Sequence, residues 1–290
     1  MCKRLFGLLL SILSIISMVC DSVGQCSAAA VELPAVSAKA YIVMEATTRE
    51  VFFSQNADEH LPMASTTKIM TTLLCLESGD LDTPFPVDNN AIQVEGSSMG
   101  LVKDDIVTKR ALCYGMLLPS GNDAAGATAV KLAGSLSAFA DLMNERAAQL
   151  GMQNTHFVTP SGLHDEQHYS TAYDMALLGC AAVNEPTLRR MVSTRTAVIG
   201  GRTLTNHNKL LSRLDGCVGL KTGYTKAAGR TLVSCAEQAG HRLVAVTLRD
   251  GDDWNDHEAL YRWGFLLTGI QETLETRLLG ALENGREVTP

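Results

Sequence analysis

The order of strand-rich and helix-rich segments constrains the fold of this chain more than any other feature. Residues 38–44 and 50–54 have the pattern of two strands joined by a polar turn. A long stretch with helical periodicity follows, and the last third returns to segments rich in Val, Leu and Thr. Strands at the two ends of a chain pair most economically in one sheet, with the helices inserted beside it. The sequence therefore predicts an α+β fold with an antiparallel sheet, and we expect the chemistry in a cleft between sheet and helices.

The periodicity also predicts the residue ranges of the individual strands and helices. Further strands are predicted at 194–199, 218–222, 231–237 and 242–249, all in the same sheet as the N-terminal hairpin. Helices are predicted at 63–76, 108–118, 122–133, 136–150, 171–183 and 258–267, with Ser170 as the cap of the fifth.

The N-terminus has the three-part layout of a secretory signal peptide over residues 1–30. Lys3 and Arg4 precede about 15 apolar residues, and three alanines at 28–30 form a small-residue processing site. Because a membrane span needs about 20 residues, an uncleaved anchor is the weaker alternative. We expect a catalytic domain at 31–270 and a short helical tail at 271–290, without a second β domain. Ile270, at the end of the domain, and Leu274, Leu278 and Leu282 of the tail share one helical face.

Charge and cysteine content exclude several classes of protein. The net charge of −7, without a basic block, argues against a nucleic-acid partner. Five cysteines remain after the leader, an odd number with no CxxC pair. We therefore predict neither a zinc site nor a set of disulfides, and no metal or cofactor. Cys75, Cys113, Cys180 and Cys235 lie in apolar runs and are expected to be buried.

Ser65 and Lys68 begin the first long helix, one turn apart, so the hydroxyl and the amine can face the same side. A serine needs a base to become nucleophilic, and a lysine becomes a base only when burial or a second cation lowers its pKa. Alone, this SxxK pattern is also compatible with a helix cap followed by a surface lysine.

Two further motifs follow. Ser120, Gly121 and Asn122 form a turn before an alanine-rich helix, and could be a capped loop or a hydroxyl and an amide in an active site. Lys221, Thr222 and Gly223 lie on a predicted strand followed by Tyr224, which could end in an ordinary turn or dock an extended peptide at a sheet edge.

In this order, the motifs resemble those of the penicillin-binding protein and serine β-lactamase superfamily. Ser-Gly-Asn is similar to the middle motif of the low-molecular-mass D-alanyl-D-alanine carboxypeptidases, whereas class A β-lactamases usually have Ser-Asp-Asn. The resemblance covers about residues 38–265 and includes the segments 61–68, 120–125, 154–157, 160–163, 170–172, 208–211 and 219–225. It implies a β-lactamase/transpeptidase-like fold.

The resemblance also implies the roles of the site residues. Ser65 attacks a stem peptide that ends in D-Ala-D-Ala, Lys68 is the general base, and Ser120 relays the proton to the leaving D-alanine. Backbone N–H groups of Ser65 and Tyr224 form the oxyanion hole. Asn122 holds the substrate or orients Lys68, and Lys221 and Thr222 bind the terminal carboxylate beside Gly223. Many relatives have His at the position of Tyr224. Because the expected contribution there is a backbone N–H, the change should affect substrate preference more than catalytic activity.

Some residues near the motifs keep two interpretations. Arg249 could contact the carboxylate or be a surface arginine. Cys217, four residues before Lys221, should share its face of the strand and is expected to be a structural thiol or an oxidation-sensitive one. His164 and His207 are interpreted as structural, since the implied chemistry needs no imidazole.

The resemblance implies an enzyme of cell-wall biogenesis and cell shape that acts outside the cytoplasmic membrane and binds β-lactam antibiotics covalently. A DD-endopeptidase or β-lactamase of the same superfamily and a non-catalytic β-lactam sensor are the alternatives. The acidic residues of the tail argue against membrane binding, and peripheral membrane association stays open.

Overall fold

The computed structural model describes residues 35–283, with side chains to residue 273. The predicted signal peptide at 1–30 and the last seven residues of the predicted tail lie outside the described residues. The described part belongs to one compact unit.

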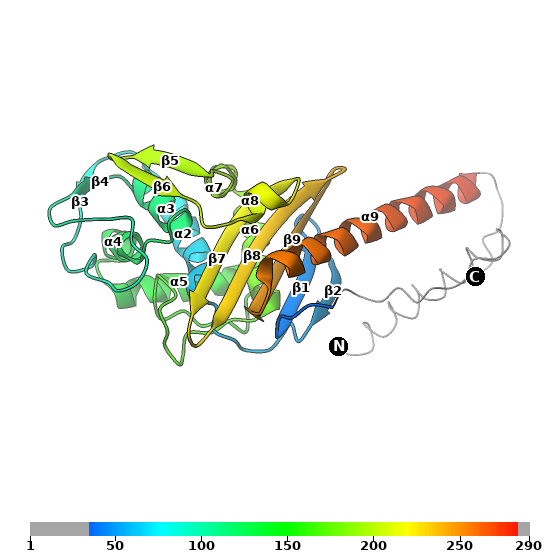
Figure 1. Cartoon of the computed structure of the whole chain (residues 1–290), viewed down its shortest axis with the longest axis horizontal. Coiled ribbons are helices and arrows are strands. Elements are labelled where there is room, and N and C mark those ends of the chain that lie inside the picture. Colours follow the sequence, from blue (N-terminus) through cyan, green and yellow to red (C-terminus); the bar gives the residue numbers. More distant parts are fainter. Residues whose placement is uncertain (1–34, 284–290) are drawn as a thin grey trace. The chain divides into compact units, whose positions relative to one another are not determined.

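A five-stranded antiparallel sheet, in the order β2-β1-β9-β8-β7, joins the two ends of the described chain. The N-terminal hairpin pairs with the C-terminal strands through β1 and β9, which confirms the predicted assembly (Figure 1). The strand β7, which carries Lys221, lies at one edge. The strands are β1 (Ala40–Glu45), β2 (Val51–Gln55), β7 (Cys217–Thr225), β8 (Gly229–Gln238) and β9 (His241–Asp250).

The strand predicted at 194–199 does not join this sheet, and this prediction was wrong. Thr196–Ile199 is β5, which pairs only with β6 (Arg202–Thr205) in a separate hairpin. Gly200 and Gly201 form its two-residue turn, with φ of 57° and 75°. Such positive angles suit a tight hairpin turn, so the strand finds its partner locally. A second small sheet pairs β3 (Phe85–Pro86) with β4 (Ile106–Val107).

Helices lie on both faces of the main sheet. The larger core lies between the sheet and the layer that contains α2 and α6, and a smaller one lies between the sheet and α9. Figure 1 shows α9 crossing the strands. The helical elements are η1 (Ala64–Thr67), α2 (Lys68–Glu77), α3 (Lys109–Leu117), α4 (Asn122–Ala133), α5 (Leu136–Leu150), α6 (Ala172–Asn184), α7 (Pro186–Val192), α8 (Leu210–Arg213) and α9 (Asp253–Glu283).

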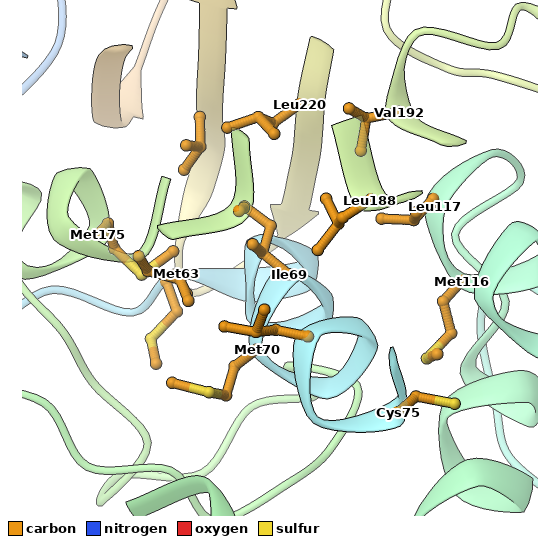
Figure 2. Packing of buried hydrophobic residues seen from close by; sticks show 14 of the residues in the cluster. Met63, Ile69, Met70, Cys75, Met116, Leu117, Met175, Leu188, Val192 and Leu220 are labelled. Atoms are coloured by element: carbon orange, nitrogen blue, oxygen red, sulfur yellow. The ribbon is translucent and has the colours of Figure 1, made fainter. Parts of the chain in front are cut away.

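Helix α2 is buried on nearly all sides, because most of its residues are apolar or small. Figure 2 shows Ile69 and Met70 of α2 among Leu188 of α7, Met116 of α3 and Leu220 of β7. A helix held by packing on every side gives its first turn, where Lys68 lies, a fixed position.

Two local predictions need correction. Helix α6 is capped by the Thr171 hydroxyl, which accepts from the Asp174 amide at 3.0 Å, and not by Ser170. Helix α9 is much longer than the predicted 258–267, since it begins at Asp253 and continues to Glu283.

Candidate active site

Ser65 and Lys68 are brought together at the start of α2. Ser65 lies in the 3-10 turn η1, is partly exposed, and its Oγ is 2.9 Å from Lys68 Nζ. The turn approaches Gly162 so closely that a β-carbon there would lie 1.9 Å from the Ala64 carbonyl oxygen. Gly162 has φ of 83°, a conformation that glycine adopts without steric cost. The SxxK segment is therefore a buried, specifically packed element and not a surface cap.

The Lys68 amine is completely buried and has three polar partners. Besides Ser65 Oγ, Nζ donates to Asn122 Oδ1 at 2.8 Å and to the Ser161 carbonyl oxygen at 2.7 Å. Burial, and secondly the charge of Lys221, hold the pKa of Lys68 well below its usual value, with Asp123 acting in the opposite direction. A neutral amine has two N–H donors and one lone pair. Because the two carbonyl oxygens can only accept, the lone pair is left for the Ser65 hydroxyl.

Asn122 begins α4 and ties this helix to the loop at 95–101. Its backbone N–H donates to the Ser97 carbonyl and its Nδ2 donates to the Glu95 carbonyl, both at 2.7 Å. Because Nδ2 donates to Glu95, the amide group of Asn122 is held with Oδ1 facing Lys68. This supports the predicted role of Asn122 in orienting the lysine.

The neighbouring Asp123 is a site residue whose role the sequence analysis missed. Its buried carboxylate accepts from the Ser98 hydroxyl and from the backbone N–H groups of Met99, Gly100 and Leu101, the last three at 2.9–3.1 Å. A carboxylate in the first turn of a helix was the available signal. Asp123 holds the loop at 98–101 beside Asn122.

Ser120 lies in the turn between α3 and α4, two residues before Asn122. It is buried and has φ of 65°, an unusual angle for a residue other than glycine. Within residues 35–283, its hydroxyl forms no hydrogen bond. The structure brings Ser120 to the site, and its role in proton relay stays a prediction.

The third motif lies on edge strand β7. Lys221 is buried, its Nζ donates to the Thr222 carbonyl at 2.8 Å, and burial lowers its pKa to about 7. A β-carbon at Gly223 would lie 2.9 Å from the Ser65 backbone nitrogen, so the strand passes directly beside the serine. The Tyr224 side chain is 67% exposed, as expected if only its backbone contributes.

Comparison with known proteins identifies the family of this site. The family model described as D-alanyl-D-alanine carboxypeptidase, peptidase family S11, matches residues 27–252. The carboxypeptidase DacB2 of Mycobacterium tuberculosis is 34% identical over 252 residues, which cover 83% of this chain and 86% of that protein. This chain belongs to the S11 peptidase family.

Solved structures agree with this S11 assignment. The crystal structure of a D-alanyl-D-alanine carboxypeptidase from Mycobacterium tuberculosis superposes with a TM-score of 0.78 at 31% identity, covering 84% of this chain and 96% of that one. Penicillin-binding protein D2 from Listeria monocytogenes, in its ampicillin-bound form, gives 0.73 at 31% identity, covering 79% and 98%. The predicted β-lactamase/transpeptidase-like fold class is confirmed.

Relatives differ in length. The matched region covers 72% of this S11 chain but 56% of the carboxypeptidase DacF of Bacillus subtilis, to which it is 34% identical. The chain thus spans little more than half of that relative and most of the mycobacterial one.

Cys217 does not share a face with Lys221, which corrects the prediction from strand periodicity. A β-bulge between Cys217 and Gly219 adds one residue to β7. Cys217 consequently lies opposite Ala236, which packs towards α9, whereas Lys221 lies opposite Val233, which packs towards the other layer. Burial raises the pKa of the Cys217 thiol to about 11, so the thiolate that reacts with oxidants is scarce.

The remaining residues near the motifs differ in their exposure and in their contacts. Arg249 is exposed, and its guanidinium donates to the Ala227 carbonyl in the β7–β8 turn at 2.9 Å. His164 and His207 are both exposed, and the pKa of His207 is lowered by partial desolvation of its ring and by the charge of Lys221. The other four cysteines, Cys75, Cys113, Cys180 and Cys235, are free and buried. Among the described residues, no group of His, Cys, Asp and Glu side chains could hold a metal ion.

Proposed function

We propose that this S11 peptidase is a serine-type D-alanyl-D-alanine carboxypeptidase that removes the terminal D-alanine of peptidoglycan stem peptides. The observation that supports this most strongly is the buried Lys68 amine, whose two N–H groups are used by carbonyl oxygens and whose third partner is Ser65 Oγ at 2.9 Å. A serine activated by a neutral amine is one arrangement that supplies the nucleophile for acyl transfer.

In this proposal, Ser65 attacks the carbonyl of the penultimate D-alanine while Lys68 accepts the hydroxyl proton. The Ser65 and Tyr224 backbone N–H groups stabilise the oxyanion, where one donor typically contributes about 10²–10³ in rate. Ser120 relays the proton to the leaving D-alanine, and water then hydrolyses the acyl-enzyme. The closeness of Gly223 to the Ser65 amide supports a substrate position between β7 and η1.

The terminal carboxylate of the substrate would bind Lys221 and Thr222. Lys221 is buried with a pKa of about 7, so at neutral pH a large fraction carries the positive charge. A bound carboxylate stabilises that charge and raises the pKa further. This preference for a free carboxyl terminus distinguishes a carboxypeptidase from an endopeptidase, and Asn122 would position the peptide between the two motifs.

We also propose that the protein acts outside the cytoplasmic membrane of a bacterium, on the cell wall. The names of its relatives as D-alanyl-D-alanine carboxypeptidases and the signal-peptide pattern at 1–30 support this location. No helix between residues 35 and 283 is long and apolar enough to span a membrane. The ampicillin-bound form of the Listeria relative supports binding of β-lactams, and in this proposal the bond is covalent and forms on Ser65.

Acylation by ampicillin tests the nucleophile and the reaction class. The purified protein should gain the mass of one ampicillin, with the adduct on the peptide that contains Ser65. Ser65→Ala should gain none, and Ser98→Ala, which changes another serine hydroxyl near the site, should still be acylated. An unmodified wild-type protein that is demonstrably folded contradicts the proposal. Rapid turnover of ampicillin favours a β-lactamase, and a stable adduct without D-alanine release from peptides favours a β-lactam sensor.

A further inference from the structure

The buried histidine His168 has contacts that its sequence position does not suggest. It is 3% exposed and lies in the connection between α5 and α6, with its ring against Phe157 at a centroid distance of 5.8 Å. Its Nδ1 accepts from the backbone N–H of Val158 at 2.9 Å and of Thr159 at 3.3 Å. Its Nε2 lies 2.8 Å from the Thr67 hydroxyl.

These partners determine the tautomer of His168. Backbone N–H groups can only donate, so Nδ1 must be unprotonated, and the neutral ring carries its proton on Nε2. Nε2–H therefore donates to Thr67 Oγ1. Burial holds the pKa of His168 down at about 4, so the ring keeps this form at neutral pH.

The segment that His168 holds leads directly to Lys68. Two residues after Thr159, the Ser161 carbonyl accepts from Lys68 Nζ at 2.7 Å. Between them, the Pro160 carbonyl accepts from Thr71 Oγ1 at 2.6 Å. His168 thus joins the chain at 158–159 to Thr67, the residue before Lys68. It fixes one carbonyl acceptor of the lysine relative to the helix that carries the lysine.

We propose that His168 is a positioning residue for acylation, which holds the Ser161 carbonyl so that the lone pair of Lys68 points at Ser65. This inference rests on the proposed acyl-serine function. If the Ser161 carbonyl moves, one N–H of Lys68 loses its acceptor, and the amine rotates away from the serine. A displacement of about 1 Å in such a site can cost about 10²-fold in rate.

Two substitutions distinguish the contributions of the two ring nitrogen atoms. In His168→Asn, the amide oxygen can occupy the place of Nδ1 and still accept from Val158, but the contact with Thr67 is lost. In His168→Gln, the amide reaches the place of Nε2 and keeps Thr67, but nothing accepts from Val158 and Thr159. The backbone directly after His168 is also anchored without Thr67, because Ser170 exchanges two backbone hydrogen bonds with Leu61, four residues before Ser65. The proposal therefore places the essential contact on the Nδ1 side, and the Thr67 contact is a second tie to the same region.

The measurement is the second-order rate constant of acylation by a fluorescent penicillin, normalised to the fraction of folded protein. The Gln variant should be slower by about 10²-fold. The Asn variant should lose no more than about fivefold, the size expected for one neutral hydrogen bond. Thermal unfolding of each variant gives the accompanying loss of stability.

His257 provides a matched control. It is also completely buried, with Nδ1 2.7 Å from Ser234 Oγ and Nε2 3.0 Å from Thr247 Oγ1, but it lies on the α9 side of the sheet. His257→Gln should lose stability and keep the wild-type acylation rate. The inference is overturned if the Gln variant of His168 is acylated as fast as wild type, or if the control is slowed equally. If wild type itself is not acylated, the proposed function fails first.

A spectroscopic measurement on the wild-type protein tests the same contacts without a substitution. A long-range ¹H–¹⁵N spectrum at neutral pH should show His168 with an unprotonated Nδ1 and a protonated Nε2. A proton on Nδ1 is incompatible with the two backbone donors and overturns the inference.

Discussion

Gly223 lies so close to Ser65 that a β-carbon on the glycine would be 2.9 Å from the serine's backbone nitrogen. The same β-carbon would meet Thr231 Oγ1 at 2.4 Å, and that hydroxyl donates to the Met63 carbonyl at 3.0 Å. Edge strand β7 and the turn η1 are therefore in direct contact, with no room for a side chain between them. The width of the proposed substrate site depends on this contact.

Gly223→Ala should separate β7 from η1 and slow acylation. Contacts below 3 Å must relax, and a shift of about 1 Å can cost about 10²-fold in rate. Gly269→Ala, in the open environment of α9, should leave the rate unchanged and gain up to about 1 kcal/mol of stability. Stopped-flow acylation and thermal unfolding check both. An alanine variant at 223 that is acylated at the wild-type rate would contradict this account.

The two buried lysines predict a bell-shaped dependence of kcat/KM on pH. The rate should rise as Lys68, with its lowered pKa, loses its proton, and should fall above about pH 7 as Lys221 loses its own. Because a bound carboxylate raises the pKa of Lys221, the alkaline limb of kcat should lie at higher pH than that of kcat/KM. Alkaline limbs that coincide would show that Lys221 does not bind the carboxylate.

Lys221→Met should raise KM and move the acidic limb to higher pH. Loss of a charge-assisted hydrogen bond costs about 1.5–3 kcal/mol, which corresponds to about tenfold to 100-fold in KM. Removal of the second cation raises the pKa of Lys68, although its burial remains. Lys226→Met, at an exposed lysine in the β7–β8 turn, is the control and should change neither quantity. An acidic limb that stays in place in the Lys221 variant would exclude electrostatic coupling of the two amines.

Two buried histidines predict a loss of stability in acid. Burial lowers the pKa of His168 to about 4 and that of His257 to about 3, against 6.5 when unfolded. The unfolded chain binds these protons first, so their contribution is fully present above about pH 6.5 and is lost as the pH falls towards these values. At about 1.4 kcal/mol per pKa unit, each contributes a few kcal/mol.

Asp250 acts in the opposite direction, because burial and Asp256 raise its pKa to about 6. The folded protein binds this proton first, and stability rises between about pH 6 and 3.8. Two histidines outweigh one carboxyl, so the free energy of unfolding should decrease on acidification. His257→Gln should be less stable at neutral pH and show a shallower decrease. Denaturant titrations over pH check this, and a steeper slope in the variant would contradict it.

The sequence predicted the bounds of a helix correctly where several local signals coincide. Helices α4 and α5 have the predicted bounds, because Gly134 and Gly151 end them with φ of 77° and 86° and the Ser135 hydroxyl caps the second. The three motifs also meet as expected, since Lys68 contacts Asn122 and a β-carbon at Gly223 would lie 2.9 Å from the Ser65 backbone nitrogen.

The sequence did not predict those features of the fold and the site that are set by long-range contacts or by single-residue irregularities. The bulge after Cys217 reverses the face of that residue, and strand periodicity contains no sign of it. β5 pairs with β6 across the glycine turn at 200–201, and the residue pattern of β5 alone does not distinguish such a hairpin from a strand of the main sheet. His168 accepts from backbone N–H groups earlier in its own loop, and Asp123 accepts from those of the loop at 98–101, contacts that no residue pattern reveals.

Release of D-alanine from diacetyl-lysyl-D-Ala-D-Ala tests the central claim most directly. We predict that the wild-type protein releases one D-alanine per peptide, and that Ser65→Ala, although folded, releases none. Wild-type protein that is folded and acylated by penicillin but releases no D-alanine would contradict the carboxypeptidase assignment. Release that persists in Ser65→Ala would contradict the acyl-serine mechanism itself.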